Sequence, residues 1–326
     1  MAEPILQLKT LKTYFHTDQG IVRAVDGINL SIHERETLGI VGESGSGKSV
    51  TALSILRLID PPGKILGGEI LFQGVNLLTL SKSEMRQIRG DKISMIFQEP
   101  MASLNPLFRI THQIEEALRL HRHLSSREAR EKAMELLRLV GIPSPEKRAR
   151  DFPHQLSGGM QQRVMIAMAL ACNPAVLIAD EPTTALDVTI QAQILHLVDR
   201  LKKEIGTAVL FITHDLCVIS KIAQNVAVMY AGKVVEFSNV YDLFDDPSHP
   251  YTRALLESIP TGSKGKAGKR RLNAIPGTVP NLVELPPGCS FAARCMDRMP
   301  PCEREEPPEI EIKSGRKVRC WKYHHA

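Results

Sequence analysis

The chain has 326 residues, of which 43% are hydrophobic and 24% are charged, and its formal net charge is +5. These values are typical of a globular protein with one large core and room for a small second module. Because charges of both signs are mixed along the chain, nucleic-acid binding has little support. No apolar run reaches the roughly 18 residues of a membrane-spanning helix. The N-terminus lacks a secretory signal pattern, so we expect a cytoplasmic location.

The first hundred residues are rich in predicted strands. Alternating or continuous apolar runs predict strands, in chain order, over residues 5–8, 21–32, 38–41, 68–72 and 92–97. A helix is predicted over residues 50–58, ending before Pro61-Pro62-Gly63.

Residues 110–171 carry apolar side chains at helical spacing. The predicted elements that follow are a buried strand over 176–179, a helix over 188–203, a strand over 209–213 and a hairpin over 226–237. Alternating strands and helices indicate an α/β fold with a mainly parallel sheet. We therefore predict one domain over residues 1–260, with a helical subdomain inserted at about 100–172.

The composition changes after residue 260. Residues 261–288 are rich in Gly, Pro, Lys and Arg, and four of the six cysteines follow. We predict a small Cys-rich C-terminal module over residues 261–326. The basic cluster at residues 264–271 is interpreted as a solvated linker.

Residues 42–49 read GESGSGKS, a complete G-x-x-x-x-G-K-[ST] phosphate loop between a predicted strand and a predicted helix. In such a loop, backbone N–H groups and the helix N-terminus form an anion site. Lys48 is expected to reach the β- and γ-phosphates, and the Ser49 hydroxyl to ligate Mg²⁺. The predicted nucleotide-binding residues of the loop are Gly42, Glu43, Ser44, Gly45, Ser46, Gly47, Lys48 and Ser49.

Two carboxylates end the predicted strand over residues 176–179. Asp180 is placed to meet Mg²⁺, directly or through water, as phosphate-loop enzymes require. Glu181 can polarise a water molecule for in-line attack on the γ-phosphate. Ser157, Gly158 and Gly159 precede an apolar helix and predict a second γ-phosphate contact site at a helix N-terminus.

The order of these motifs resembles the ATP-binding cassette of ABC transporters. The resemblance covers residues 1 to about 260 and rests on the phosphate loop, Gln98, the LSGGM sequence at 156–160, Asp180-Glu181, Ala185-Leu186-Asp187 and His214. It implies a RecA-like core with a β subdomain and an inserted helical subdomain. It also implies that two cassettes pair head-to-tail, with ATP between the phosphate loop of one and the Ser157–Gly159 segment of the other.

The resemblance assigns further roles to matching residues. Tyr14 would stack on adenine, with its neighbour Phe15 as the alternative. Gln98 would sense Mg²⁺ and the attacking water, and its loop would contact the membrane subunit. His214 would bind the γ-phosphate, and Asp187 would line the seam between the two cassettes. Glu181 and His214 argue against a regulator that only senses ATP.

A further resemblance, to the cassettes of dipeptide and oligopeptide importers, rests on residues 98–106, on residues 249–256 and on the late module at Gly288-Cys289. We therefore expect an ATPase that energises peptide import. The alternatives are a cassette of a nickel or other small-solute importer, or a soluble non-transport cassette ATPase. Met160 stands where the family often has Gln, but activity is expected to persist because Ser157 and both glycines remain.

The resemblance also implies partners. These are a second cassette (another copy or a paralogue), two transmembrane permease subunits and, indirectly, an extracytoplasmic solute-binding protein. The protein would then lie at the cytoplasmic face of the membrane. The single phosphate loop and the absence of a sustained heptad repeat argue against cassettes that act on ribosomes or in DNA repair.

Cys289, Cys295, Cys302 and Cys320 are separated by five, six and seventeen residues. These gaps differ from the paired spacings of zinc ribbons and from the close run of bacterial ferredoxins. Three interpretations stay open: a [4Fe–4S] cluster, which the resemblance to peptide-importer cassettes supports, a Zn²⁺ site, or cysteines without a metal, as unligated thiols or artefactual disulfides. A metal in this module would be a structural element, with no redox role required.

Overall fold

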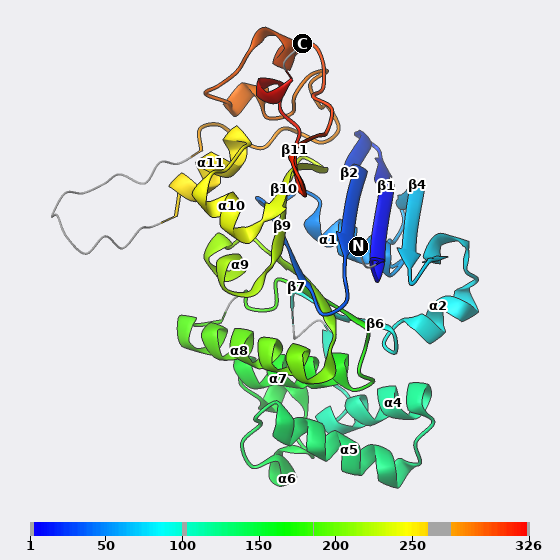
Figure 1. Ribbon diagram of the computed structural model, residues 1–326. Coiled ribbons are helices and arrows are strands. Elements are labelled where there is room, and N and C mark those ends of the chain that lie inside the picture. The colour runs from blue at the N-terminus through cyan, green and yellow to red at the C-terminus, as the bar shows by residue number, and fades with distance from the viewer. Residues whose placement is uncertain (1–2, 100–102, 185, 260–274, 325–326) are drawn as a thin grey trace, which may run out of the picture. The chain divides into compact units, whose positions relative to one another are not determined.

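The computed structural model describes residues 3–99, 103–184, 186–259 and 275–324. The chain forms two compact units (Figure 1). The first unit comprises Met1–Leu6, Ser31–Thr37 and Leu71–Ile212, and the second comprises Gln7–Leu30, Leu38–Ile70 and Thr213–Ala326. The expected boundary at residues 260–261 lies outside the described residues.

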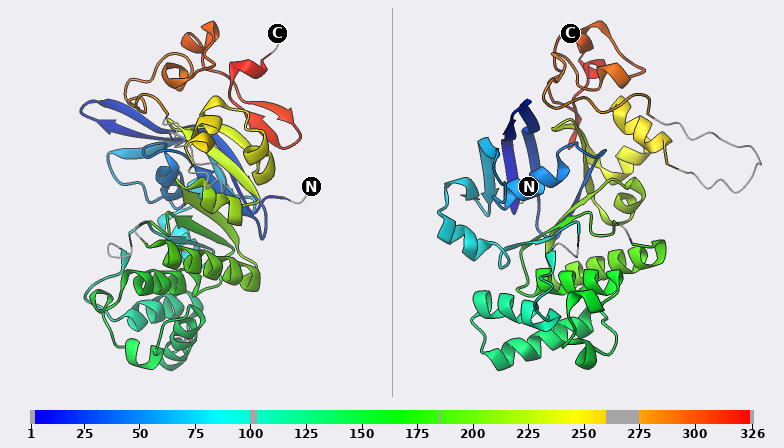
Figure 2. Two further views of the ribbon diagram at one scale, coloured as in Figure 1. Left: turned by 90° about the vertical axis from the view of Figure 1, so that its left-hand side faces the viewer. Right: turned by 180° about the vertical axis from the view of Figure 1, so that it is seen from behind.

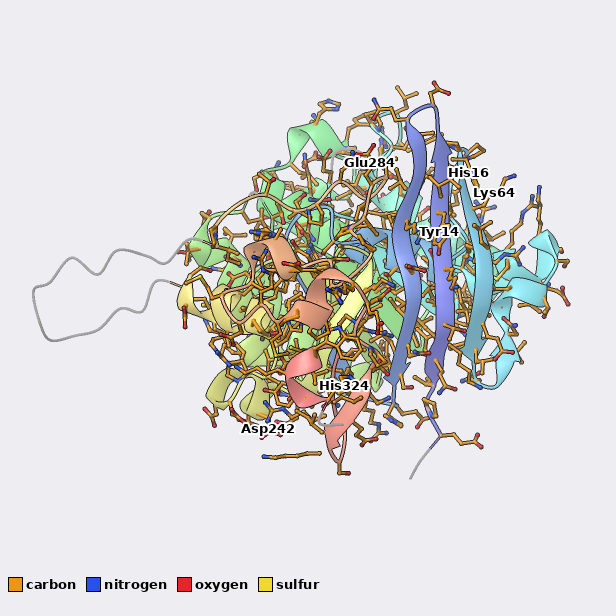
Figure 3. All side chains as sticks on the ribbon, turned by 90° about the horizontal axis from the view of Figure 1, so that it is seen from above. Tyr14, His16, Lys64, Asp242, Glu284 and His324 are labelled. Carbon is orange, nitrogen blue, oxygen red and sulfur yellow. The ribbon has the colours of Figure 1, made fainter. Side chains whose placement is uncertain are left out.

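Most of the first antiparallel sheet belongs to the second unit. Its strands there are β1 (Leu6–Thr17), β2 (Gly20–Ile32) and β4 (Gly63–Phe72), in the order β2-β1-β4. Figure 3 shows these long strands side by side and labels Tyr14 and His16 on β1. Strand β1 is longer than the predicted strand over 5–8, because the exposed Lys9, Thr10 and Lys12 interrupt its apolar pattern while Leu11 and Thr13 stay buried.

The phosphate-loop strand belongs to another set of strands in the second unit. These are β3 (Thr37–Val41), β9 (Asn225–Tyr230), β10 (Lys233–Asn239), β11 (Ile310–Lys313) and β12 (Arg316–Val318). Their order is β11-β12-β10-β9-β3. Strand β3 runs parallel to β9, with Ile40 opposite Ala227, whereas β9 and β10 form the predicted antiparallel hairpin. The helices of this unit are α1 (Lys48–Ile55), α9 (Leu216–Ile222), α10 (Val240–Asp245) and α11 (Pro250–Glu257).

The described residues of the first unit contain three parallel strands, β6 (Ile93–Ile96), β7 (Val176–Asp180) and β8 (Ala208–Thr213). Val176 of β7 lies opposite Ile93 on one side and Ala208 on the other. Every residue of β7 and β8 is buried. The predicted α/β class is therefore confirmed, and strand β7 delivers Asp180 at its carboxyl end.

Helices fill most of the remaining first unit. They are α2 (Lys82–Ile88), α4 (Ile110–Arg122), α5 (Ser126–Leu139), α6 (Pro145–Arg148), α7 (Gly158–Leu170) and α8 (Val188–Ile205), and a short strand β5 (Val75–Asn76) pairs with the end of β4. Helices α4, α5 and α7 pack on one another, as the green helices of Figure 2 show. No helix among the described residues is long and apolar enough to cross a membrane.

Candidate functional site

The phosphate loop connects β3 to α1 through backbone conformations that require glycine. Gly42 has φ 157° and Gly47 has φ 101°. A Cβ on Gly42 would lie 2.2 Å from the carbonyl oxygen of Met229, and one on Gly47 would lie 2.1 Å from that of Ala24. The loop therefore packs directly on the backbone of neighbouring strands, and a side chain at either position would displace it.

The side chain of Lys48 forms hydrogen bonds within the phosphate loop. Lys48 is 5% exposed, and its Nζ donates hydrogen bonds to the carbonyl oxygens of Gly42 (2.8 Å) and Glu43 (3.0 Å). The following helix α1 has no side-chain cap at its N-terminus and no acidic residue in its first turn. Within the described residues, the buried Ser46 hydroxyl has no hydrogen-bond partner. An uncapped helix N-terminus beside a lysine and an unpaired hydroxyl fits a bound phosphate group.

Glu43 of the loop is held by residues from distant parts of the second unit. Its backbone N–H donates to the Tyr251 hydroxyl over 2.9 Å. Its carboxylate accepts two hydrogen bonds from Arg294, at 2.7 Å and 3.0 Å. The Glu43 side chain therefore forms an ion pair within the chain, and its predicted part in nucleotide binding stays a prediction.

Tyr14 forms a hydrogen-bonded group with Asp26 and Lys233. The Tyr14 hydroxyl donates to Asp26 over 2.6 Å, and Lys233 lies 2.9 Å from the same carboxylate. Burial and the hydrogen bond to Asp26 raise the pKa of Tyr14 to about 12. Burial alone would raise the pKa of Asp26, but the hydrogen bonds from Tyr14 and Lys233 outweigh it and lower that pKa.

Phe15 lies on the other face of strand β1. Successive side chains of a strand point to opposite faces, so Phe15 shares its face with Thr13. The Thr13 hydroxyl is 2.8 Å from that of Ser54 on α1, and a Cβ on Gly63 would lie 2.5 Å from the Phe15 ring. Phe15, and not Tyr14, is thus on the side of β1 that faces the phosphate-loop helix.

In the first unit, Asp180 and Glu181 lie at the end of β7, as the sequence predicts. Asp180 is 4% exposed. Glu181 has a left-handed backbone with φ 45°, which is strained for a residue other than glycine. Its N–H donates to the carbonyl oxygen of Ile212 over 2.9 Å, so strand β8 holds this conformation.

Two side chains orient the Glu181 carboxylate. The Gln98 amide nitrogen donates to Oε2 over 3.2 Å, and the Thr184 hydroxyl donates to the same oxygen over 2.9 Å. The structure thus brings together Gln98 and Glu181, which the sequence predicted as parts of one site. Both donors are neutral, so they fix the direction of the carboxylate without compensating its charge.

The Ser157–Gly159 segment begins helix α7. Ser157 occupies the N-cap position without a side-chain hydrogen bond to the helix, and Ser157 and Gly158 are exposed. A Cβ on Gly159 would lie 3.0 Å from Ile190 of α8, so glycine allows close helix packing there. Asp187 caps α8, because its Oδ1 accepts the N–H of Ile190 over 2.9 Å. Its predicted place in a cassette seam stays a prediction.

His214 follows β8 and is exposed in the second unit. The next residue, Asp215, caps α9 by accepting the N–H of Cys217 over 2.8 Å, and its own N–H donates to the Thr213 hydroxyl over 3.0 Å. These bonds fix the turn that carries His214. Its γ-phosphate role stays a prediction, as does the Mg²⁺ role of Ser49.

Among the four C-terminal cysteines, the other three affect the pKa of Cys289. Burial raises the pKa of Cys289 to about 12, and Cys302, Cys320 and Cys295 contribute smaller increases. The Cys289 N–H donates to the carbonyl oxygen of Cys302 over 2.8 Å. Within the described parts of the chain, however, no three His, Cys, Asp or Glu side chains are arranged to hold a metal ion. The expected cluster is therefore not supported by the side-chain positions.

Some predicted features fall outside the described residues. They are part of the extended Gln98 loop (residues 100–102), Ala185 of the Ala-Leu-Asp motif, and the basic cluster at 264–271.

Sequence reasoning missed three residues of these sites: Thr184, Tyr251 and Arg294. Tyr251 lies within residues 249–256, whose resemblance to peptide-importer cassettes assigns it no role. Thr184 follows Glu181 by three residues, a spacing that could have indicated a local hydrogen bond. No local signal pairs Arg294 with Glu43, because they are 251 positions apart.

Two family profiles match the chain. The profile for "ABC transporter" matches residues 25–184. The profile for "Oligopeptide/dipeptide transporter, C-terminal region" matches residues 235–302.

Similar proteins extend over nearly the whole chain. A probable peptide ABC transporter ATP-binding protein of Sinorhizobium fredii, y4tR, is 53% identical over 98% of this chain and 96% of its own length. The oligopeptide transport ATP-binding protein OppD of Bacillus subtilis is 52% identical over 98% of this chain and 89% of its own length. Among solved structures, the dimeric post-hydrolysis state of the cassette MJ0796 bound to ADP and Pi has a TM-score of 0.65 at 33% identity, covering 72% of this chain and 98% of that one.

Proposed function

This chain belongs to the ABC transporter ATP-binding proteins of the oligopeptide and dipeptide importer family, and we propose that its hydrolysis of ATP energises peptide import. The chain is an ATPase of the ABC cassette type. The peptide assignment is carried by one observation: the relatives match both the cassette and the C-terminal region over 98% of the chain. These relatives favour peptides over nickel, other small solutes and the soluble cassette functions.

We propose that two cassettes work as a pair, this chain with another copy or with a paralogue. The exposed Ser157 and Gly158 at the N-terminus of α7 support this, because an exposed helix N-terminus without a side-chain cap suits a phosphate group of a nucleotide held by a partner. The pair would drive two transmembrane permease subunits from the cytoplasmic face of the membrane. An extracytoplasmic peptide-binding protein would deliver the solute.

Glu181 is proposed as the general base for hydrolysis, with Gln98 positioning the water. The hydrogen bonds from Gln98 and Thr184 support this role, because they fix the direction of the carboxylate. His214 is proposed to contact the γ-phosphate. Ser49, Asp180 and Gln98 would hold Mg²⁺, which when bound neutralises charge on the phosphates.

We propose that Phe15, and not Tyr14, provides the adenine contact. The Tyr14 hydroxyl is engaged with Asp26 on the opposite face of β1, whereas Phe15 lies on the face of the phosphate-loop helix. Stacking needs only an aromatic face, which Phe15 offers.

For the C-terminal region, we propose that its four cysteines hold a [4Fe–4S] cluster or, alternatively, Zn²⁺. The backbone hydrogen bond of 2.8 Å from Cys289 to Cys302 supports it, while the described side-chain positions do not form a ready metal site. Iron, sulfide and zinc analysis of protein purified without oxygen tests this proposal. A preparation that contains none of the three would exclude it.

The transport proposal is tested by ATP hydrolysis of the complex in lipid nanodiscs. The complex would contain this chain, its partner cassette and the permease subunits. Adding the binding protein loaded with an oligopeptide should raise the hydrolysis rate above that with the empty binding protein. Equal rates with and without peptide, together with stimulation by a nickel-loaded binding protein, would contradict the peptide assignment.

A further inference from the structure

We propose that Arg294 is a positioning residue of the phosphate loop, which neutralises Glu43 and links the C-terminal segment to ATP binding. This inference rests on the proposed nucleotide site at residues 42–49. It goes beyond that site because Arg294 lies far along the chain and belongs to none of the nucleotide-binding motifs.

The contact is bidentate and largely shielded from water. Two guanidinium nitrogens donate to the two carboxylate oxygens of Glu43, at 2.7 Å and 3.0 Å. The Arg294 side chain is 5% exposed, whereas that of Glu43 is 28% exposed. A fork of this kind fixes orientation as well as charge, so Arg294 determines where the Glu43 side chain lies.

Arg294 is itself held rigidly. Its Nε donates to the carbonyl oxygen of Pro276 over 2.9 Å, and Nη1 also donates to the Tyr230 hydroxyl over 3.3 Å. The guanidinium carbon lies 5.8 Å from the Tyr230 ring centroid and 6.0 Å from that of Phe291. These contacts restrict the Arg294 side chain to one conformation. The ion pair therefore does not depend on a flexible surface arginine.

A second contact acts on the backbone of the same loop residue. The Tyr251 hydroxyl accepts the Glu43 N–H over 2.9 Å. Tyr251 packs on Tyr230 and Phe291, with ring centroids 4.6 Å and 5.3 Å away, and all three rings are buried. One aromatic cluster therefore supports both the backbone and the side chain of Glu43.

The charges explain why the arginine is needed. Glu43 follows Gly42 in a loop proposed to bind a triphosphate, and an unpaired carboxylate there would repel the ligand. Arg294 compensates that charge and draws the carboxylate onto the C-terminal segment. Because the pair is partly buried, salt screens it less than it would screen an exposed pair.

The turn that carries Arg294 lies between two of the cysteines. Residues Ala292–Arg294 form a 3₁₀ turn, in which the Ala292 N–H donates to the Cys289 carbonyl over 2.9 Å. The Cys295 N–H donates to the Ala292 carbonyl over 3.3 Å. The backbone that presents Arg294 to Glu43 is therefore held by hydrogen bonds that involve Cys289 and Cys295.

The test is a double-mutant cycle read out as the affinity of the purified full-length chain for Mg-ATP. Arg294→Met leaves the Glu43 charge uncompensated, and we expect affinity to fall about tenfold. Glu43→Gln should bind Mg-ATP more tightly than Arg294→Met, because it leaves no uncompensated carboxylate beside the phosphate loop. The double variant Arg294→Met/Glu43→Gln should return to within about twofold of wild type. Arg298→Met is the matched control, since Arg298 is 52% exposed in the same segment and pairs with Glu303.

Each outcome decides the question. Wild-type affinity in Arg294→Met, or a double variant that binds as weakly as Arg294→Met alone, would overturn the proposal, because a merely structural arginine is not rescued by Glu43→Gln. Arg294→Lys keeps the charge without the fork and should lose less affinity than Arg294→Met; this comparison serves if the Met variant unfolds. Lys48→Ala separates the proposed nucleotide site from the proposed role of Arg294. If Lys48→Ala leaves ATP affinity unchanged, the nucleotide site itself is wrong. If Lys48→Ala weakens ATP binding while Arg294→Met binds normally, only the role of Arg294 is refuted.

Discussion

The Gln98 amide lies 3.2 Å from the Glu181 carboxylate, although the two residues are 83 positions apart in the chain. Gln98 follows strand β6 and Glu181 follows strand β7, which run parallel with Ile96 opposite Ala179. Adjacent parallel strands end at the same edge of their sheet, and this edge therefore collects the residues proposed for hydrolysis.

The variant Glu181→Gln tests the general base. It keeps the size of the side chain and an acceptor for Thr184, but it cannot take a proton. We expect ATP turnover to fall by about 10²–10⁴-fold while ATP binding persists. Steady-state hydrolysis and equilibrium nucleotide binding check this result. Glu204→Gln on the exposed face of α8 is the control, and near-normal turnover in Glu181→Gln would remove Glu181 from its role.

Single substitutions of the two neighbouring aromatic residues test which of them contacts adenine. Phe15→Ala should weaken ATP binding by about 1 kcal/mol, the energy typical of an aromatic contact. Tyr14→Ala removes the ring as well as the hydroxyl bonded to Asp26, and it should leave ATP affinity near that of wild type. Titration with a fluorescent ATP analogue measures both variants. The reverse pattern would return the stacking role to Tyr14.

Glu236 is fully buried and accepts the N–H groups of Ser248 and His249, each over 2.8 Å. It also lies 3.9 Å from Arg316, whose side chain is 4% exposed. Glu236→Ala should lower the free energy of unfolding by about 3–5 kcal/mol, because it leaves a buried cation and two donors without this partner. Urea denaturation checks this value.

The matched control is Glu69→Ala, since Glu69 forms a surface pair with Lys9 and is 50% exposed. Its expected cost is below about 1 kcal/mol. Equal costs for the two variants would mean that the buried carboxylate contributes nothing specific.

The buried His249 is expected to make the free energy of unfolding depend on pH. Its ring is 1% exposed and its Nδ1 accepts the Tyr251 N–H, and burial lowers its pKa from 6.5 to about 3. The unfolded chain therefore binds a proton that the folded chain does not between these values, and stability falls as the pH drops from 6.5 towards 3. His249→Asn, which retains a helix-capping acceptor, should reduce this slope relative to wild type.

The control for this experiment is His16→Asn, at an exposed position of β1. Denaturant midpoints measured at pH 7, 6, 5 and 4 give the slopes. Identical slopes in wild type and His249→Asn would show that His249 is not the group responsible.

The parts of the fold that the sequence predicted are those with strong local patterns. Continuous apolar runs predicted β3, β7 and β8, because buried parallel strands need apolar residues on both faces. Helix α1 ends at Ile55, earlier than predicted, because Arg57 has a left-handed backbone with φ 52° that stops the helix before the prolines.

Elements stabilised by distant partners were missed. Strand β12 is three residues long and pairs with β10, with Val318 opposite Glu236, so its own sequence carries little strand pattern. The choice between Tyr14 and Phe15 likewise required the face of β1 that each occupies. The Arg294–Glu43 pair could not be predicted, because the two residues are 251 positions apart and no local sequence pattern relates them.

The most direct test of the central claim is ATP-dependent uptake of a labelled oligopeptide into proteoliposomes that contain the assembled transporter and its binding protein. With wild-type chain we expect ATP-dependent accumulation of peptide, and with Glu181→Gln in every copy of this chain we expect uptake near the level without ATP. Equal uptake by wild type and Glu181→Gln, or no uptake by an assembled complex that hydrolyses ATP, would contradict the proposal that hydrolysis at this site drives peptide import.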